Sequence, residues 1–198
     1  MNPPNWFTSA SLFCSTYAMA LVLSAGAHPE PAVLARACVL VVFGGVFDLL
    51  DGRVARAMNR YTEFGVQLDS IADVIGFGLA PALLAWVWKL QDLGAIGFLA
   101  TFTYVLCAAF RLARFNVAVN DDSWRLEGHT QGLTSTMAGG CMVTLIWVSN
   151  GYLLDWLVVP AWVMALFTGW LGLLMISSIP FRSFKDLRVN RKARRFLA

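Results

Sequence analysis

Four aspartates lie close together in the first half of the chain, within stretches that are otherwise apolar: Asp48, Asp51, Asp69 and Asp73. A charged side chain at the centre of a bilayer costs ~2.5–3.5 kcal/mol on insertion scales, so four unpaired ones would cost roughly 10 kcal/mol or more. Because the only strong ligands here are carboxylate oxygens, with no Cys or His nearby, the group suits a hard cation such as Mg²⁺, Mn²⁺ or Ca²⁺. A divalent-metal site is therefore the expected compensation for these acids.

The chemistry that such a site favours is displacement at a phosphate. Four carboxylates can hold two ions, and paired ions ~4 Å apart are a recurring device for this reaction. A carboxylate that is not fully used as a ligand can accept the proton of an attacking hydroxyl, and Arg56 is placed to meet a phosphate. Two other interpretations remain open at this point: the acids pair with the arginines of the same region, or they line an ion pathway.

Helix geometry predicts that the acids form two facing surfaces. At about 100° per residue, Asp51 falls about 60° from Asp48, and the small residues Gly52 and Ala55 lie on the same face. The same arithmetic gathers a second set within an arc of about 80°: Gly65, Asp69, Asp73, Gly76 and Ala80. Small residues let helices approach closely, so carboxylates from two helices are expected to meet.

The composition indicates what kind of protein positions these acids. The chain has 198 residues, of which 58% are hydrophobic and 14% charged, against roughly 25% charged in an ordinary soluble domain. We expect an all-α integral membrane protein with six transmembrane helices of ~20 residues, forming a single domain over 1–198. The apolar runs that predict these helices are 10–27, 32–47, 65–88, 93–110, 133–148 and 157–179.

Three segments outside these runs carry further expectations. Residues 1–9 include Trp6 and Phe7 and form a possible interfacial segment. Residues 117–131 form the longest polar loop, which could close over the site. Residues 181–198 form a basic tail that holds seven of the fifteen Lys and Arg residues. The four cysteines and two histidines show no metal-ligand spacing, which argues against a zinc-type site.

The positive charges predict the orientation. With six spans, thirteen Lys and Arg residues fall on one side of the membrane, and only Arg36 and Lys89 fall near the other. Cytoplasmic loops carry the excess of positive charge. We therefore expect both termini and the active site at the cytoplasmic end of the bundle, in a cytoplasmic (inner) membrane.

The acidic motif also resembles a known family. The pattern Asp48-x-x-Asp51-Gly52-x-x-Ala55-Arg56, then eight residues, then Gly65-x-x-x-Asp69-x-x-x-Asp73 is similar to the signature of the CDP-alcohol phosphotransferases. The resemblance implies six transmembrane helices, an active site at the cytoplasmic end and a homodimer. It also implies attack of an alcohol on the CDP-linked phosphate, with release of CMP.

The resemblance further implies a role for each matching residue. Asp48, Asp51 and Asp69 would be metal ligands, with Asp73 completing a second metal site and acting as the catalytic base. The cofactors would be two divalent cations, Mg²⁺ or Mn²⁺. The residues that frame the CDP moiety would be Gly52, Ala55, Arg56 and Gly65.

Two further stretches, L-D-S-I-A-D-V-I-G-F-G-L-A-P-A and R-L-A-R-F-N, look like the serine branch of this family, in which CDP-diacylglycerol transfers its phosphatidyl group to L-serine. The glycerol-phosphate branch usually has a proline after the third aspartate and a lysine after the fourth, whereas this chain has Ser70 and Val74. One departure from the serine branch is that Thr134 and Thr136 stand where prolines are common.

A physical argument points to the same acceptor. Serine brings a carboxylate, and Arg111 and Arg114, about 60° apart on a helix, could bind it by charge-assisted hydrogen bonds, with Asn116 adding a neutral contact. Alternatively, these arginines mark the end of a helix or bind a phosphate on another acceptor, such as glycerol 3-phosphate or an inositol phosphate. A small cation transporter is the alternative from a different class of protein.

Overall fold

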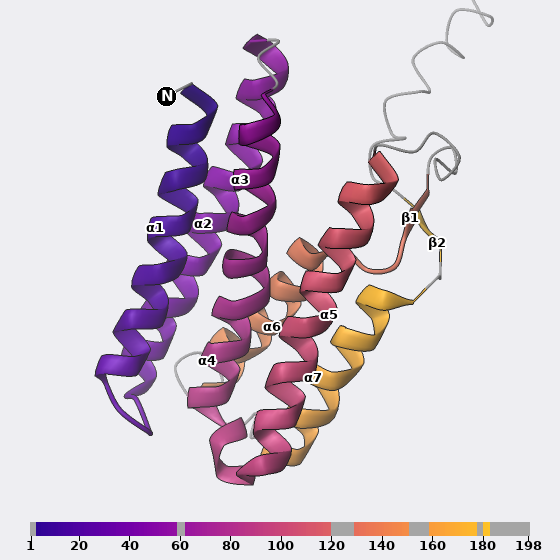
Figure 1. The fold of residues 1–198 in the computed structure, drawn as a ribbon. Helices are drawn as coiled ribbons and strands as arrows, with labels where there is room; N and C mark the ends of the chain where they lie inside the picture. Colours follow the sequence, from indigo (N-terminus) through magenta and orange to yellow (C-terminus); the bar gives the residue numbers. More distant parts are fainter. Residues whose placement is uncertain (1–2, 59–61, 120–128, 151–158, 178–179, 183–198) are drawn as a thin grey trace, which may run out of the picture.

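The computed structural model describes residues 3–58, 62–119, 129–150, 159–177 and 180–182. Within these residues the protein is a helical bundle with one pair of three-residue strands (Figure 1). In chain order the elements are α1 (Pro3–Ser24), α2 (Pro31–Met58), α3 (Glu63–Asp73), the π-helical turn η1 (Val74–Leu79), α4 (Ala80–Trp88), the 3₁₀ turn η2 (Leu90–Leu93), α5 (Ala95–Val119), β1 (His129–Gln131), α6 (Ser135–Ser149), α7 (Ala161–Ile176) and β2 (Pro180–Arg182).

Within the described ranges, four helical stretches are long and apolar enough to cross a bilayer: Asn5–Ser24, Pro31–Val54, Phe64–Trp88 and Ala95–Val117. The helices α6 and α7 are apolar but shorter, with 15 and 16 residues. The expectation of a helical membrane protein is therefore confirmed, while six spans and their orientation stay predictions.

The predicted helices are found with shifted boundaries. The helix α1 begins at Pro3, before the predicted start at residue 10, because proline is tolerated in the first turn of a helix. Residues 3–9 therefore belong to α1, although Trp6 is 65% exposed on its outer face. The helix α5 continues to Val119, and the remainder of the predicted 117–131 loop up to residue 128 lies outside the described residues, as does the basic tail from residue 183.

One face of α1 carries a stripe of buried polar side chains, which we call the α1 polar stripe: Asn5, Thr8, Ser11 and Ser15. Their spacing of three to four residues places them on one side of the helix. A Cβ added to Gly44 of α2 would lie 3.0 Å from Ser15 Oγ, and one added to Gly76 of η1 would lie 3.2 Å from the same atom. The glycines thus let α1, α2 and η1 approach closely around Ser15.

The π-helical turn η1 follows directly after Asp73 and separates α3 from α4. Pro81, in the first turn of α4, has no N–H to donate to the carbonyl of Phe77 four residues earlier. The hydroxyl of the buried Tyr104 on α5 donates to that carbonyl instead, at 3.0 Å. Such π segments occur frequently at functional sites.

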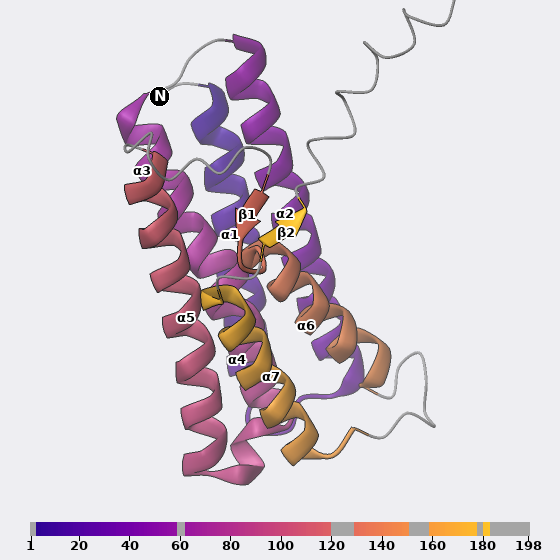
Figure 2. The same ribbon diagram turned by 90° about the vertical axis from the view of Figure 1, so that its right-hand side faces the viewer.

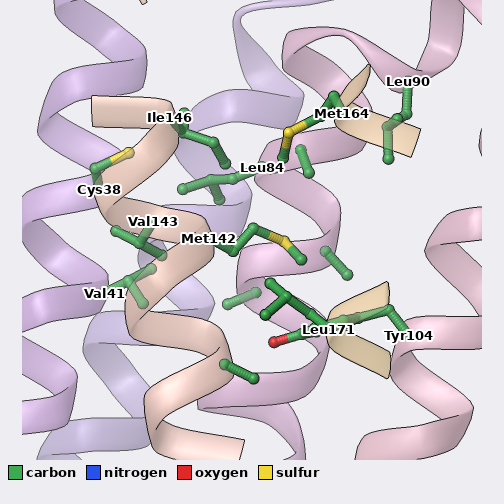
Figure 3. Close-up of a cluster of buried hydrophobic side chains, with 14 of the residues drawn as sticks. Cys38, Val41, Leu84, Leu90, Tyr104, Met142, Val143, Ile146, Met164 and Leu171 are labelled. Atoms are coloured by element: carbon green, nitrogen blue, oxygen red, sulfur yellow. The ribbon is translucent and has the colours of Figure 1, made fainter. Parts of the chain in front are cut away.

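The apolar core lies between α4 and the helices α1, α2, α5, α6 and α7, and Figure 3 shows part of it. Its labelled side chains are Cys38, Val41, Leu84, Leu90, Tyr104, Met142, Val143, Ile146, Met164 and Leu171. Gly139 lets α6 pack tightly on η1, since a Cβ there would lie 2.9 Å from the carbonyl oxygen of Phe77. Among the described residues, α3 contributes none to this cluster.

One end of the bundle brings together the parts of the chain that carry the sequence motifs. The start of α1, the ends of α2 and α5, the start of α3 and the strand pair lie toward this end (Figures 1 and 2). The strands are antiparallel, with Thr130 opposite Phe181, so they join the segment before α6 to the segment after α7. Asp48 and Asp51 lie in the C-terminal half of α2, which ends at Met58, and Asp69 and Asp73 lie in α3, which begins at Glu63.

Candidate active site

Three aspartates form a cluster between α2 and α3. One carboxylate oxygen from each of Asp48, Asp51 and Asp69 lies within 4.8 Å of the other two. Asp51 is the most enclosed, with 6% of its surface exposed. The two acidic helix faces therefore meet, as the spacing predicts, and three carboxylates at this separation match the donor set of a hard divalent cation.

Asp73 extends this cluster by one helical turn along α3. One oxygen of its carboxyl group lies close enough to the Asp48 carboxyl group to interact with it directly. The other oxygen, Asp73 Oδ1, is buried and has no hydrogen-bond partner among the described residues. A buried, unpartnered carboxylate oxygen is costly unless a cation or a donor compensates it, so this oxygen marks a place suited to a metal or a substrate proton.

The helix α1 contributes a contact to the cluster that the sequence interpretation missed. Thr8 Oγ1 donates a hydrogen bond of 2.8 Å to Asp51 Oδ2, and both residues are buried. The sequence feature that could have predicted this contact is the α1 polar stripe. Polar residues that repeat on one face of an otherwise apolar helix indicate a polar neighbour.

The glycines of the motif have two different surroundings. A Cβ added to Gly52 would have no atom of the described residues within 4 Å, so open space adjoins the backbone beside Asp51 within this part of the structure. A Cβ added to Gly65 would lie 3.0 Å from Thr62 Oγ1, which caps α3 by accepting from the Gly65 N–H at 3.1 Å. The side chains of Ala55 and Arg56 lie outside the described part of the structure, so their predicted contacts with CDP stay predictions.

Arg111 and Arg114, predicted to act together on the acceptor, have different environments. Arg111 is half-buried, donates from Nη1 to Ser135 Oγ at 3.1 Å and interacts electrostatically with Asp73. Its Nε is buried without a partner among the described residues. Arg114 is exposed, whereas the guanidinium of Arg111 interacts with an acid of the cluster, Asp73.

Asn116 is joined to the acidic helix by a hydrogen bond to Ser70. Asn116 Nδ2 donates to Ser70 Oγ at 3.0 Å, and the Ser70 hydroxyl has two acceptors within reach, the Val66 carbonyl at 3.0 Å and Asn116 Oδ1 at 3.2 Å. Ser70 follows Asp69 directly in α3. The structure thus places Asn116 beside the cluster with its amide engaged by Ser70, and its contact with an acceptor stays a prediction.

The segment with two threonines in place of prolines keeps a backbone that proline could adopt. Thr134 has φ −70° and ψ 144°, close to the φ of about −65° that a proline ring imposes. Its hydroxyl caps α6 by accepting from the Met137 N–H at 3.2 Å. The neighbouring Ser135, which accepts from Arg111, therefore keeps a well-defined position at the start of α6.

Comparison with known proteins gives a consistent result. A family model described as CDP-alcohol phosphatidyltransferase matches residues 1–176. A protein of Helicobacter pylori (strain ATCC 700392 / 26695) is 35% identical over 96% of this chain and 75% of its own length. A protein of Bacillus subtilis (strain 168) is 33% identical over 92% of this chain and 90% of its own length. Both are named CDP-diacylglycerol--serine O-phosphatidyltransferase.

Proposed function

Because the chain belongs to the CDP-alcohol phosphatidyltransferase family, we propose that it transfers the phosphatidyl group of CDP-diacylglycerol to L-serine, giving phosphatidylserine and CMP. The names of its relatives in Helicobacter pylori and Bacillus subtilis support serine as the acceptor. The observation that carries the chemistry is the meeting of Asp48, Asp51 and Asp69 between two apolar helices.

The acidic cluster fits the metals that the family implies. Asp48, Asp51 and Asp69 offer three carboxylate oxygens within 4.8 Å of one another, and Asp73 adds a buried oxygen that lacks a partner among the described residues. These side chains would hold two divalent ions, Mg²⁺ or Mn²⁺. When bound, such ions screen the charge of the diphosphate and stabilise the departing oxygen of CMP.

Asp73 is the residue placed to accept the proton of the attacking hydroxyl. The serine oxygen forms a bond to the phosphorus of the phosphatidyl group, and the bond from that phosphorus to the oxygen bridging it to CMP breaks. CMP leaves with the bridging oxygen, and the proton of serine passes to the Asp73 carboxylate. The unpartnered Oδ1 of Asp73 supports this role, because it has a free lone pair within the described site.

Arg111 is the residue best placed to bind the carboxylate of serine. It is half-buried beside Asp73, and its hydrogen bond to Ser135 Oγ fixes the guanidinium at the start of α6. Charge-assisted hydrogen bonds are stronger than neutral ones, particularly where water is excluded. Arg114 and Asn116, one turn further along α5, would complete the acceptor side, while Gly52, Ala55, Arg56 and Gly65 would frame the CDP moiety.

We further propose that the chain is one membrane domain over residues 1–198, with six spans and both termini in the cytoplasm. The active site would face the cytoplasm from the inner membrane, and two copies would form a homodimer. The charge distribution supports the orientation.

An acceptor screen tests the proposal. Purified protein with CDP-diacylglycerol and Mn²⁺ is supplied with radiolabelled serine, alone or with excess glycerol 3-phosphate or inositol phosphate. Release of CMP that depends on serine, with label appearing in lipid, is the expected result. CMP release that depends on another acceptor would show that the acceptor is wrong, and cation flux into vesicles without CMP release would favour a transporter.

A further inference from the structure

Thr8 of α1 makes a buried contact with the acidic cluster. Its Oγ1 donates to Asp51 Oδ2 at 2.8 Å, and the two residues are 5% and 6% exposed although 43 positions separate them in the sequence. We infer that Thr8 is a positioning residue, which orients the Asp51 carboxylate for metal binding. This inference rests on the proposed function, because it takes Asp51 to be a metal ligand.

The chemistry of a carboxylate explains why a donor is useful here. A carboxylate turns readily about its terminal torsion, and an ion binds well only when the oxygen lone pairs point toward it. A donor on one oxygen fixes the plane of the group, while each oxygen keeps further lone pairs for an ion. Partners of this kind behind a ligand typically change metal affinity 10–100-fold when they are removed.

The position of Thr8 is itself well fixed. As a β-branched residue in a helix, Thr8 is confined mainly to two χ1 rotamers. Farther along the α1 polar stripe, Ser15 lies against both Gly44 and Gly76, where added Cβ atoms would come within 3.0 and 3.2 Å of its Oγ. One turn before Thr8, Asn5 Oδ1 lies 3.5 Å from the Cβ position of Gly65 on α3. Contacts on both sides of Thr8 thus hold α1 against α2, α3 and η1.

The competing explanation is that Thr8 only fills space between α1 and α2. A residue with that role alone would change the thermal stability of the protein and leave its metal affinity unchanged. Metal affinity measured without substrates therefore separates positioning from packing.

The experiment uses the full chain in detergent and titrates it with Mn²⁺, followed by electron paramagnetic resonance of the free ion. Thr8→Val removes the hydroxyl and keeps the shape, whereas Thr8→Ser keeps the hydroxyl. Thr16→Val is the matched control, because Thr16 lies exposed on the same helix and its hydroxyl donates to the backbone carbonyls of Leu12 and Phe13. We expect Thr8→Val to raise the Mn²⁺ dissociation constant about tenfold or more, with Thr8→Ser and Thr16→Val close to the unmodified protein.

An unchanged Mn²⁺ dissociation constant in Thr8→Val, with or without a lower melting temperature, would overturn the inference. Asp51→Asn distinguishes this result from failure of the metal site: if Asp51→Asn also binds Mn²⁺ like the unmodified protein, the proposed ligand set is wrong. Should Thr8→Val unfold in detergent, the Mn²⁺ concentration for half-maximal CMP release is measured in native membranes. An unchanged concentration there would equally overturn the role of Thr8.

Discussion

The acidic cluster and the apolar core are built on different principles, although both lie in one small bundle. The cluster is bordered by directional contacts from α1, α5 and α6, such as the hydrogen bond from Thr8 to Asp51 and the one from Arg111 to Ser135. The core instead consists of closely packed apolar side chains, including Leu84, Met142 and Met164 (Figure 3). Substitutions in the two regions should therefore alter different properties: binding and turnover in the first, stability in the second.

Glycines illustrate the same contrast. In the core, Gly139 permits close contact between α6 and η1, where any side chain would meet the backbone of Phe77. In the motif, Gly52 borders open space as far as the described residues extend. A glycine that permits protein packing and a glycine that leaves room for a ligand are thus distinguishable by what a Cβ would contact.

The largest expected effect comes from Asp73→Asn, which removes the proton acceptor and alters the ligand set. We expect turnover to fall at least about 1,000-fold, equivalent to about 4 kcal/mol, with little change in melting temperature. Serine-dependent CMP release and thermal unfolding measure the two quantities. Asp92→Asn is the control, because Asp92 is an exposed aspartate of η2. Full activity in Asp73→Asn would show that Asp73 is neither base nor essential ligand.

The next effect distinguishes two arginines of the same helix. Arg111→Gln should raise the KM for serine roughly 10–100-fold, because a hydrogen bond to a charged group contributes about 1.5–3 kcal/mol. The KM for CDP-diacylglycerol should change much less. Arg114→Gln, at an exposed position, should have the smaller effect on serine. An equal rise for both substrates in Arg111→Gln would instead indicate phosphate binding or general damage to the site.

A substitution in the core should lower the stability of the protein rather than its affinity for a substrate. Gly139→Ala places a Cβ 2.9 Å from the carbonyl oxygen of Phe77, and overpacking of this kind costs about 1–3 kcal/mol of stability. Gly140→Ala is a matched control on the next residue, where a Cβ would have nothing within 4 Å. Thermal unfolding should separate the two variants. A loss of stability in Gly140→Ala as large as that in Gly139→Ala would contradict the close contact between α6 and η1.

The smallest expected effect tests the open space at the motif. Gly52→Ala should leave stability unchanged or slightly improved, because alanine favours a helix by about 0.5–1 kcal/mol over glycine. The KM for CDP-diacylglycerol should nevertheless rise several-fold, as the new methyl group enters space that we assign to CDP. Gly169→Ala of α7, which also has nothing within 4 Å of its Cβ position, is the control. An unchanged KM in Gly52→Ala would place CDP elsewhere.

Much of this arrangement follows from local sequence features. Apolar runs predict the helices, and a period of 3.6 residues predicts that Asp48 and Asp51 share a face and meet Asp69, as the structure confirms. The contact from Thr8 to Asp51 was not predictable in the same way, because it depends on how α1 packs across α2. The start of α1 was missed for a simpler reason: residues 3–9 precede the first long apolar run, whereas the helix already begins at Pro3, in a first turn to which proline is well suited.

The π-helical turn was also beyond sequence reasoning, since it involves two residues far apart in the chain. Pro81 withholds the N–H that would pair with Phe77, and Tyr104 on another helix supplies the hydrogen bond. Neither residue alone identifies a π segment. The carbonyl of Phe77 has a hydrogen-bond donor only because the folded bundle brings Tyr104 next to it.

The π-helical turn η1 also sets how the side chains of α3 are rotated about the helix axis relative to those of α4. A π turn arises when one residue is inserted into an α-helix, and each residue of an α-helix corresponds to about 100° of rotation. Loss of one residue between Val74 and Leu79 would therefore swing Asp69 and Asp73 away from Asp48 while α4 kept its place in the core. In a lineage of such proteins, insertions and deletions should be tolerated in the connecting loops and excluded from these six positions.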